Sequence, residues 1–125
     1  PIRTPAGSLY SPEALQRMRR VLNPGGALVL HLGSPVFHAE QVRALSQTLK
    51  ATFAQVACYG TYVPLYGAYW GMAVCSDRLQ PTAVSAAQID ERLAARGVTD
   101  LQYYNADIHG ALFALPNYYR KLVLA

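Results

Sequence analysis

The sequence lacks several features that mark whole classes of protein. No apolar run is long enough to span a bilayer. The two cysteines, Cys58 and Cys75, lack metal or redox spacing, so we interpret them as buried thiols of a cytoplasmic protein. The three histidines, His31, His38 and His109, include no pair one helical turn apart. We therefore expect no metal site, and hydrogen-bonded structural roles for His38 and His109.

Long runs of one charge are absent too. The chain has 11 Lys and Arg against 7 Asp and Glu, a formal net charge of +4. Arg17, Arg19 and Arg20 are the densest basic group, near the end of a predicted helix, where positive charge complements the helix dipole. A nucleic-acid patch is the alternative interpretation of this group. Because no longer basic run is present, we expect neither nucleic acid nor a membrane as partner.

What the sequence does contain is typical of a globular domain. Its 125 residues suffice for one domain with a buried core. The first residues are Pro-Ile-Arg rather than Met, and residues 1–10 have the composition of a loop. We therefore expect residues 1–125 to be a single partial domain cut from a longer protein.

Helical and extended patterns alternate along the first half of the chain. The run 27–32 is nearly all apolar, which favours a strand buried on both faces, as in a parallel sheet. Strand, helix, strand with short joints is the α/β pattern. The elements predicted here are helices over 11–22 and 38–52 and strands over 27–32, 55–61 and 71–76.

Residues 62–70 form an aromatic stretch that contains the only tryptophan. Too few residues separate the flanking strands for a helix, so we predict an antiparallel hairpin with a wide loop. Aromatic rings beside Pro and Gly would make an apolar wall with a few polar points, suited to a small ligand with an aliphatic chain. The alternative is that these aromatics only fill a core.

The C-terminal third is predicted to be helical. Ser85 and Gln88 have the spacing of a capping box and predict a helix that starts between them. A short helix is expected over 107–115, with Asp107 as its N-cap, and a last helix from Pro116.

Three segments resemble, in the same order, motifs of the spermidine synthase (polyamine aminopropyltransferase) family. Residues 5–10, PAGSLY, resemble the family's Pro-Ala-Glu-x-Leu-Phe/Tyr segment, and residues 63–66 resemble its Ile/Val-Pro-Thr-Tyr loop. Residues 103–116 are similar to its C-terminal signature. The resemblance implies an α/β fold: the C-terminal half of a Rossmann-like methyltransferase fold, with a three-stranded mixed sheet, an antiparallel hairpin and flanking helices.

The resemblance also implies an activity. The family transfers an aminopropyl group from decarboxylated S-adenosylmethionine, a co-substrate, to putrescine, and no cofactor is expected. Such an enzyme must deprotonate the attacking amine, hold it in line with the carbon and exclude water. The family's base is an aspartate of an Asp-Ser/Thr-x-Asp-Pro motif. Pro1 resembles the proline that ends this motif. Both aspartates would then precede this chain, and the isolated chain would be inactive, with no catalytic residue of its own.

The resemblance assigns binding residues at two ends of the site. Pro5 and Ala6 match residues that border the adenine of the co-substrate, with Leu9 close by. At the amine end, Tyr66 matches the tyrosine that lines the amine pocket, and Trp70 stands where the family has an apolar wall residue.

His31 departs from the family pattern. Many members carry Gln at this strand end, with the side chain facing the substrates. Histidine is bulkier and can be charged, which would oppose a cationic amine. The identity of the amine therefore remains open.

Two other functions stay open on the sequence alone. The half-fold could be a non-catalytic interaction module, or part of a methyltransferase of the same fold. An unpaired apolar edge at residues 27–32 would be an association site, so we expect a homodimer.

Overall fold

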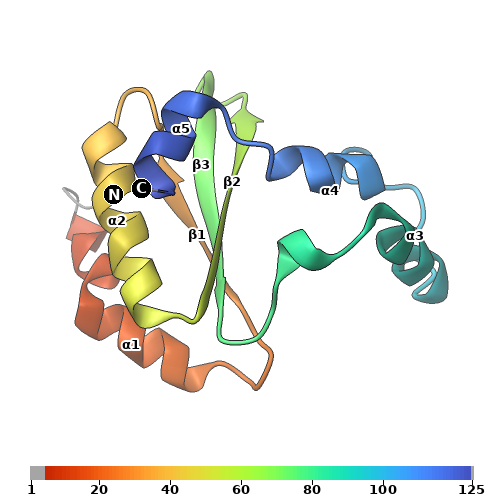
Figure 1. Cartoon of the computed structure of the whole chain (residues 1–125), viewed down its shortest axis with the longest axis horizontal. Coiled ribbons are helices and arrows are strands. Elements are labelled where there is room, and N and C mark those ends of the chain that lie inside the picture. Colours follow the sequence, from red (N-terminus) through yellow and green to blue (C-terminus); the bar gives the residue numbers. More distant parts are fainter. Residues whose placement is uncertain (1–4, 125) are drawn as a thin grey trace.

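A three-stranded antiparallel sheet forms the centre of the structure, a computed structural model that describes residues 5–124 (Figure 1). The strands are β1 (Leu28–Gly33), β2 (Gln55–Val63) and β3 (Ala68–Ser76), in the spatial order β1-β3-β2. The three predicted strands are confirmed, but the sheet is antiparallel rather than mixed. The reason is that β3 lies between β1 and β2, so the two strands that run in the same direction never pair.

The β2–β3 hairpin is longer and tighter than predicted. Its ladder runs from Gln55 opposite Ser76 to Val63 opposite Ala68, and leaves only a short turn. Gly67 closes this turn with a φ of 59°, in the left-handed region that favours glycine. Residues 69 and 70 therefore lie on a strand, where a wide loop was expected.

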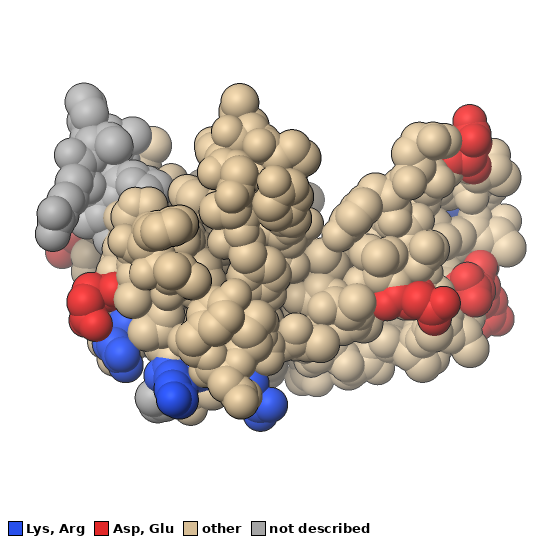
Figure 2. Space-filling view, turned by 90° about the horizontal axis from the view of Figure 1, so that it is seen from above, with Lys and Arg blue, Asp and Glu red and all other residues tan. Residues whose placement is uncertain are grey.

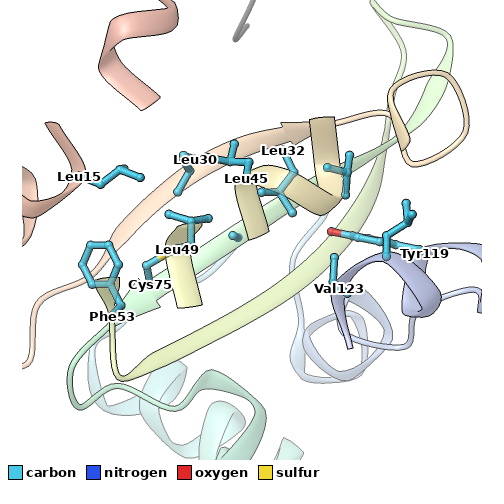
Figure 3. Close-up of a cluster of buried hydrophobic side chains, with 12 residues drawn as sticks. Leu15, Leu30, Leu32, Leu45, Leu49, Phe53, Cys75, Tyr119 and Val123 are labelled. Atoms are coloured by element: carbon cyan, nitrogen blue, oxygen red, sulfur yellow. The ribbon is translucent and has the colours of Figure 1, made fainter. Parts of the chain in front are cut away.

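Three helices cover one face of the sheet: α1 (Pro12–Val21), α2 (Ala39–Thr52) and α5 (Asn117–Val123) (Figure 1). The hydroxyl of Ser11 accepts a hydrogen bond from the N–H of Ala14 at 3.1 Å and so caps α1, as its sequence predicts. Figure 3 shows the core between helices and sheet. Its buried side chains come from α1, α2 and the residue after it, β1, β3 and α5. They are Leu15, Leu30, Leu32, Val42, Leu45, Leu49, Phe53, Ala73, Cys75, Tyr119, Leu122 and Val123.

The inner face of the sheet is buried, whereas the outer face is partly accessible and most open at β1. On β1, Leu30 and Leu32 point into the core, whereas Val29 is 52% exposed and His31 is exposed. The expectation that this strand is buried on both faces was wrong, because the three helices pack on one face only. As a result, His31 is open to a ligand.

The remaining helices form an arm that projects away from the sheet (Figure 1). They are α3 (Ala86–Ala95), which has the predicted capping box, and α4 (Ala106–Leu112). Asn105, not Asp107, caps α4, because its side-chain oxygen accepts from the N–H of Ile108 at 2.8 Å. No helix within residues 5–124 combines the length and the apolar character needed to cross a bilayer.

The N-terminal segment departs from the loop that was expected. Pro5–Tyr10 form a short 3₁₀ helix, η1, which contacts α1.

Candidate functional site

Four aromatic side chains gather at the end of the sheet beside the hairpin turn. We call His31, His38, Tyr66 and Trp70 the aromatic cluster. The ring centroids of Tyr66 and Trp70 lie 4.4 Å apart at an interplanar angle of 40°. His31 meets these two rings edge-on, with centroids at 6.5 and 6.4 Å, and His38 meets Trp70 at 6.0 Å.

Strand register explains how two of these residues meet. His31 on β1 is paired with Met72 on β3, so their side chains share a face of the sheet. Trp70 is two residues from Met72 along the same strand, and therefore lies on that face too. Beyond this point the β1–β3 register shifts, and the ladder ends with Gly33 opposite Gly71.

The other two residues of the cluster, Tyr66 and His38, are positioned by tight turns. Tyr66 lies in the hairpin turn, where its N–H donates to the carbonyl of Val63 at 3.0 Å. His38 lies directly before α2, and its N–H donates to the carbonyl of Ser34 at 2.8 Å. The Ser34 hydroxyl also accepts from the N–H of Phe37 at 2.9 Å, which fixes the turn that follows β1.

One hydrogen bond joins two members of the cluster. The indole Nε1–H of Trp70 donates to Nδ1 of His31 at 3.0 Å. Tyr66 is 47% exposed, so the cluster is accessible on this side.

The cluster stands on segments that carry no formal charge. Residues 21–39 and 55–76, which supply all four side chains, contain no Asp, Glu, Lys or Arg. Figure 2, which looks down on this end of the molecule, accordingly shows a tan surface over the hairpin, with acidic side chains on the α3–α4 arm. A cation here would be attracted by aromatic faces rather than by a carboxylate of these segments.

The structure thus brings together the three residues predicted for the amine end, His31, Tyr66 and Trp70. The residues predicted for the adenosyl end are not tested in this way. Leu9 lies on η1 and is 54% exposed. The side chains of Pro5 and Ala6, and all of Pro1, lie outside what the structure describes.

His38 is the member that the sequence analysis missed, since it was assigned a structural role. It is the last residue of the loop between β1 and α2, and ligand sites of α/β proteins are commonly built from the loops at the carboxyl ends of strands. Its position after a predicted strand was the signal in the sequence that could have marked His38 as a site residue. Its side chain makes no cap hydrogen bond to α2 and instead faces Trp70.

His109, by contrast, has the predicted structural role. Its Nε2–H donates to the carbonyl of Pro81 at 2.8 Å, and its Nδ1 accepts from the hydroxyl of Tyr104 at 2.8 Å. Its ring also packs on Phe113, which packs on Tyr59 of β2, so His109 helps to attach the arm to the sheet. Among residues 5–124, no three His, Cys, Asp or Glu side chains are grouped as metal ligands.

A roomier hollow lies elsewhere. It has a volume of about 730 Å³ and lies between β2, α5 and the root of the arm. Cys58 lines it, but burial raises the pKa of this thiol to about 11, and that of Cys75 to about 12. Raised pKa values keep both thiols protonated at neutral pH, so Cys58 is not an activated nucleophile, and we place the site at the aromatic cluster.

Comparison with known proteins gives a consistent result. The family model for the spermine/spermidine synthase domain matches residues 2–86. The polyamine aminopropyltransferase of Nitrosomonas europaea is 41% identical over 95% of the chain, and that of Sulfolobus acidocaldarius is 31% identical over 96%. The chain spans only 37% and 40% of the lengths of these curated relatives.

Solved structures show the same fold. The spermidine synthase of Thermotoga maritima superimposes with a TM-score of 0.81 at 21% identity, covering 96% of this chain and 40% of that one. A spermidine synthase in complex with the transition-state analogue AdoDATO gives a TM-score of 0.80 at 22% identity, covering 94% of this chain and 39% of that one.

Proposed function

Since this chain belongs to the spermine/spermidine synthase domain family, we propose that it supplies the amine-binding wall of a polyamine aminopropyltransferase. The complete enzyme would transfer an aminopropyl group from decarboxylated S-adenosylmethionine to a small amine, in polyamine biosynthesis. The observation that carries the proposal is the contact between the exposed Tyr66 and Trp70, beside His31, in a chain whose relatives are named polyamine aminopropyltransferases.

The chemistry of the aromatic cluster suits an aliphatic diamine. The faces of Tyr66 and Trp70 can pack against methylene groups, and they attract an ammonium group through the ring quadrupole. The hydroxyl of Tyr66 can orient the amine by a hydrogen bond. These contacts would hold the attacking nitrogen in line with the carbon beside the sulfonium and exclude water from it.

The cluster does not supply the base. Its polar atoms are imidazole nitrogens, one indole N–H and one phenol, and the segments that carry it contain no carboxylate. We assign deprotonation of the amine to a carboxylate elsewhere in the complete protein, and we expect the isolated 125-residue chain to be inactive. The adenosyl end, with Pro5, Ala6 and Leu9, rests on the resemblance of residues 5–10.

Three finer features belong to the same proposal. Putrescine or a related amine is the acceptor, with decarboxylated S-adenosylmethionine as co-substrate and no cofactor. The protein acts in the cytoplasm, which is supported by its two free thiols, since a reducing compartment keeps thiols reduced. The 125-residue chain by itself associates as a homodimer, which is supported by the outer edge of the apolar strand β1, unpaired within residues 5–124.

Substitution of Tyr66 tests the function in the full-length enzyme. Tyr66→Phe keeps the ring and removes the hydroxyl. Losing a hydrogen bond to a charged group costs about 1.5–3 kcal/mol, which corresponds to a roughly tenfold to hundredfold loss in kcat/KM for putrescine. The KM for decarboxylated S-adenosylmethionine should stay constant in steady-state assays.

Tyr62→Phe is the matched control. Tyr62 is on the same hairpin and is 63% exposed, but it is not part of the aromatic cluster. Equal losses in the two variants would contradict amine binding by Tyr66. Absence of aminopropyl transfer by the full-length protein would overturn the function itself, and methyl transfer from S-adenosylmethionine would replace it.

A further inference from the structure

The strand that carries His31 ends in an irregularity. His31 lies opposite Met72 of β3. The next pair along the ladder is Gly33 opposite Gly71, so Leu32 is an extra residue between two adjacent positions of β3. A bulge of this kind interrupts the ladder and bends the strand. Leu32 is also fully buried, so its carbonyl has to find a partner within the protein.

The side chain of Gln41, in the first turn of α2, supplies that partner. Its Nε2–H donates to the carbonyl of Leu32 at 3.1 Å. Gly33 leaves the space for this contact, because a Cβ on residue 33 would lie 3.0 Å from Nε2 of Gln41. The φ of Gly33, 117°, also lies in the region that favours glycine. One side chain therefore joins the end of β1 to the beginning of α2.

The loop between these two ends is held by its own hydrogen bonds. The buried hydroxyl of Ser34 accepts from the N–H groups of Val36 and Phe37, at 3.2 and 2.9 Å. The N–H of His38 donates to the carbonyl of Ser34. Because the loop is closed on itself, the bond of Gln41 to the strand fixes the place of the loop as a whole.

The two ends that Gln41 joins carry the two histidines of the aromatic cluster. His31 directly precedes the bulge, and His38 directly precedes α2. Both rings meet Trp70 edge-on, with centroids at 6.4 and 6.0 Å and the same interplanar angle of 71°. A change in the distance between the ends of β1 and α2 would therefore alter at least one of these two contacts.

We propose that Gln41 is a positioning residue of the amine site. By holding the carbonyl of Leu32, it fixes His31 and His38 relative to each other, and so sets how both rings meet Trp70. The inference rests on the proposed function and deepens it, since the geometry of the amine-binding wall is then set from α2. Gln41 acts through these rings and not by contact with the amine.

The test is steady-state kinetics of the full-length enzyme with Gln41→Met, which keeps the length of the side chain and removes its N–H. Without the bond the ends of β1 and α2 can move apart, so kcat/KM for putrescine should fall roughly three- to tenfold. The KM for decarboxylated S-adenosylmethionine should stay constant, because the adenosyl end is assigned to other residues. Gln41→Glu has the shape of glutamine but no donor at neutral pH, so it should lower kcat/KM for putrescine as well.

Gln47 provides the matched controls, because it lies on the same helix and is exposed. Gln47→Met and Gln47→Glu repeat the changes of side chain and charge, and both should leave the kinetics of the two substrates unchanged. Wild-type kinetics in Gln41→Met would overturn the inference. So would an equal loss for both substrates, which is the result expected if Gln41 only stabilises the fold.

A second readout does not depend on activity. The indole N–H of Trp70 lies against Nδ1 of His31, so its signal in a proton–nitrogen NMR spectrum reports on the cluster. This signal, assigned by its absence in Trp70→Phe, should shift in Gln41→Met and stay in place in Gln47→Met. An unshifted signal in Gln41→Met would contradict the positioning role. If the full-length protein lacks aminopropyl transfer, the proposed function fails, and the NMR result still decides whether Gln41 positions the cluster.

Discussion

At the scale of single residues, Gly60 has the least room for a side chain among the glycines that the structure describes. A Cβ added there would lie 2.0 Å from the hydroxyl oxygen of Tyr69, closer than real contacts allow. Tyr69 cannot easily move away, because its ring packs edge-on against the fully buried Tyr119, at a centroid distance of 6.1 Å. The hydroxyl of Tyr119 in turn donates to the carbonyl of Tyr59 at 2.9 Å.

We therefore expect Gly60→Ala to destabilise the protein. Overpacking of this kind costs about 1–3 kcal/mol in the free energy of unfolding, measurable by urea denaturation of the full-length protein. Gly110→Ala is the matched control, because Gly110 lies in α4 with open space at its Cβ position. Alanine is the better helix former by about 1 kcal/mol, so this control should be neutral or stabilising. A similar loss in both variants would contradict the steric explanation.

The sequence alone could indicate Gly60 only in part. A glycine within an apolar strand predicts close approach of another group. Which group approaches depends on the β2–β3 register, which the sequence analysis did not derive. The same limit applied to the site: Tyr66, Trp70 and His31 were predicted by resemblance, whereas the Trp70–His31 hydrogen bond follows from strand pairing.

At the scale of helices and strands, prediction worked best where local chemistry decides. Ser11 and the Ser85–Gln88 pair cap helices as expected, because capping involves residues only three apart. The cap of α4 was wrong, since Asn105 and Asp107 are both good capping residues and only the backbone distinguishes them. The burial of β1 was also wrong, because it depends on which helices cover the sheet.

Asp77 shows how an element depends on a distant side chain. It follows β3, and one carboxylate oxygen accepts from the N–H of Ala54, which joins α2 to β2, at 3.3 Å. The other accepts from Nε of Arg19 on α1 at 2.8 Å. These two donors, the Ala54 N–H first, hold the pKa of Asp77 below its ordinary value. Arg19 is thus engaged within the fold, which favours a structural role over the nucleic-acid patch considered from sequence.

The two hydrogen bonds to the Asp77 carboxylate predict a pH-dependent effect of Asp77→Asn on stability. A carboxyl group whose pKa is lowered by folding adds stability above its unfolded pKa, about 4, and loses that contribution as the pH falls through the folded value. The variant should therefore be less stable than the wild type near neutral pH, and the difference should vanish in strong acid. Denaturation curves at several pH values would measure it.

Glu40→Gln is the control for a surface ion pair. Glu40 pairs with Arg43 on the same helix at 3.6 Å and is far more exposed, so its loss should change little at any pH. If Asp77→Asn lowered the stability equally at neutral and acid pH, Asp77 would not stabilise the fold through the charge of its carboxylate.

At the scale of the whole molecule, the sheet has an apolar strand at its edge. Within residues 5–124, β1 pairs only with β3, so its other side has no strand partner there. Unpaired apolar edges associate, and the net charge of +4 is screened beyond about 8–10 Å in physiological salt.

We expect the 125-residue chain, expressed alone, to self-associate at high micromolar concentration in light scattering. Val29→Lys should weaken this association, since a lysine on an edge strand opposes pairing and Val29 is already 52% exposed. A wild-type chain that stays monomeric would contradict this prediction.

The spatial order β1-β3-β2 also sets an order in time, because the central strand is the last to be synthesised. On the ribosome, β1 and α2 emerge before β2 and β3, so the β1–β3 ladder cannot form until β3 has been synthesised. Hairpins form from local contacts, so we expect β2 and β3 to pair first, beginning at the turn closed by Gly67. The completed hairpin then offers its free edge to β1, so the β1–β3 ladder is the later of the two to form.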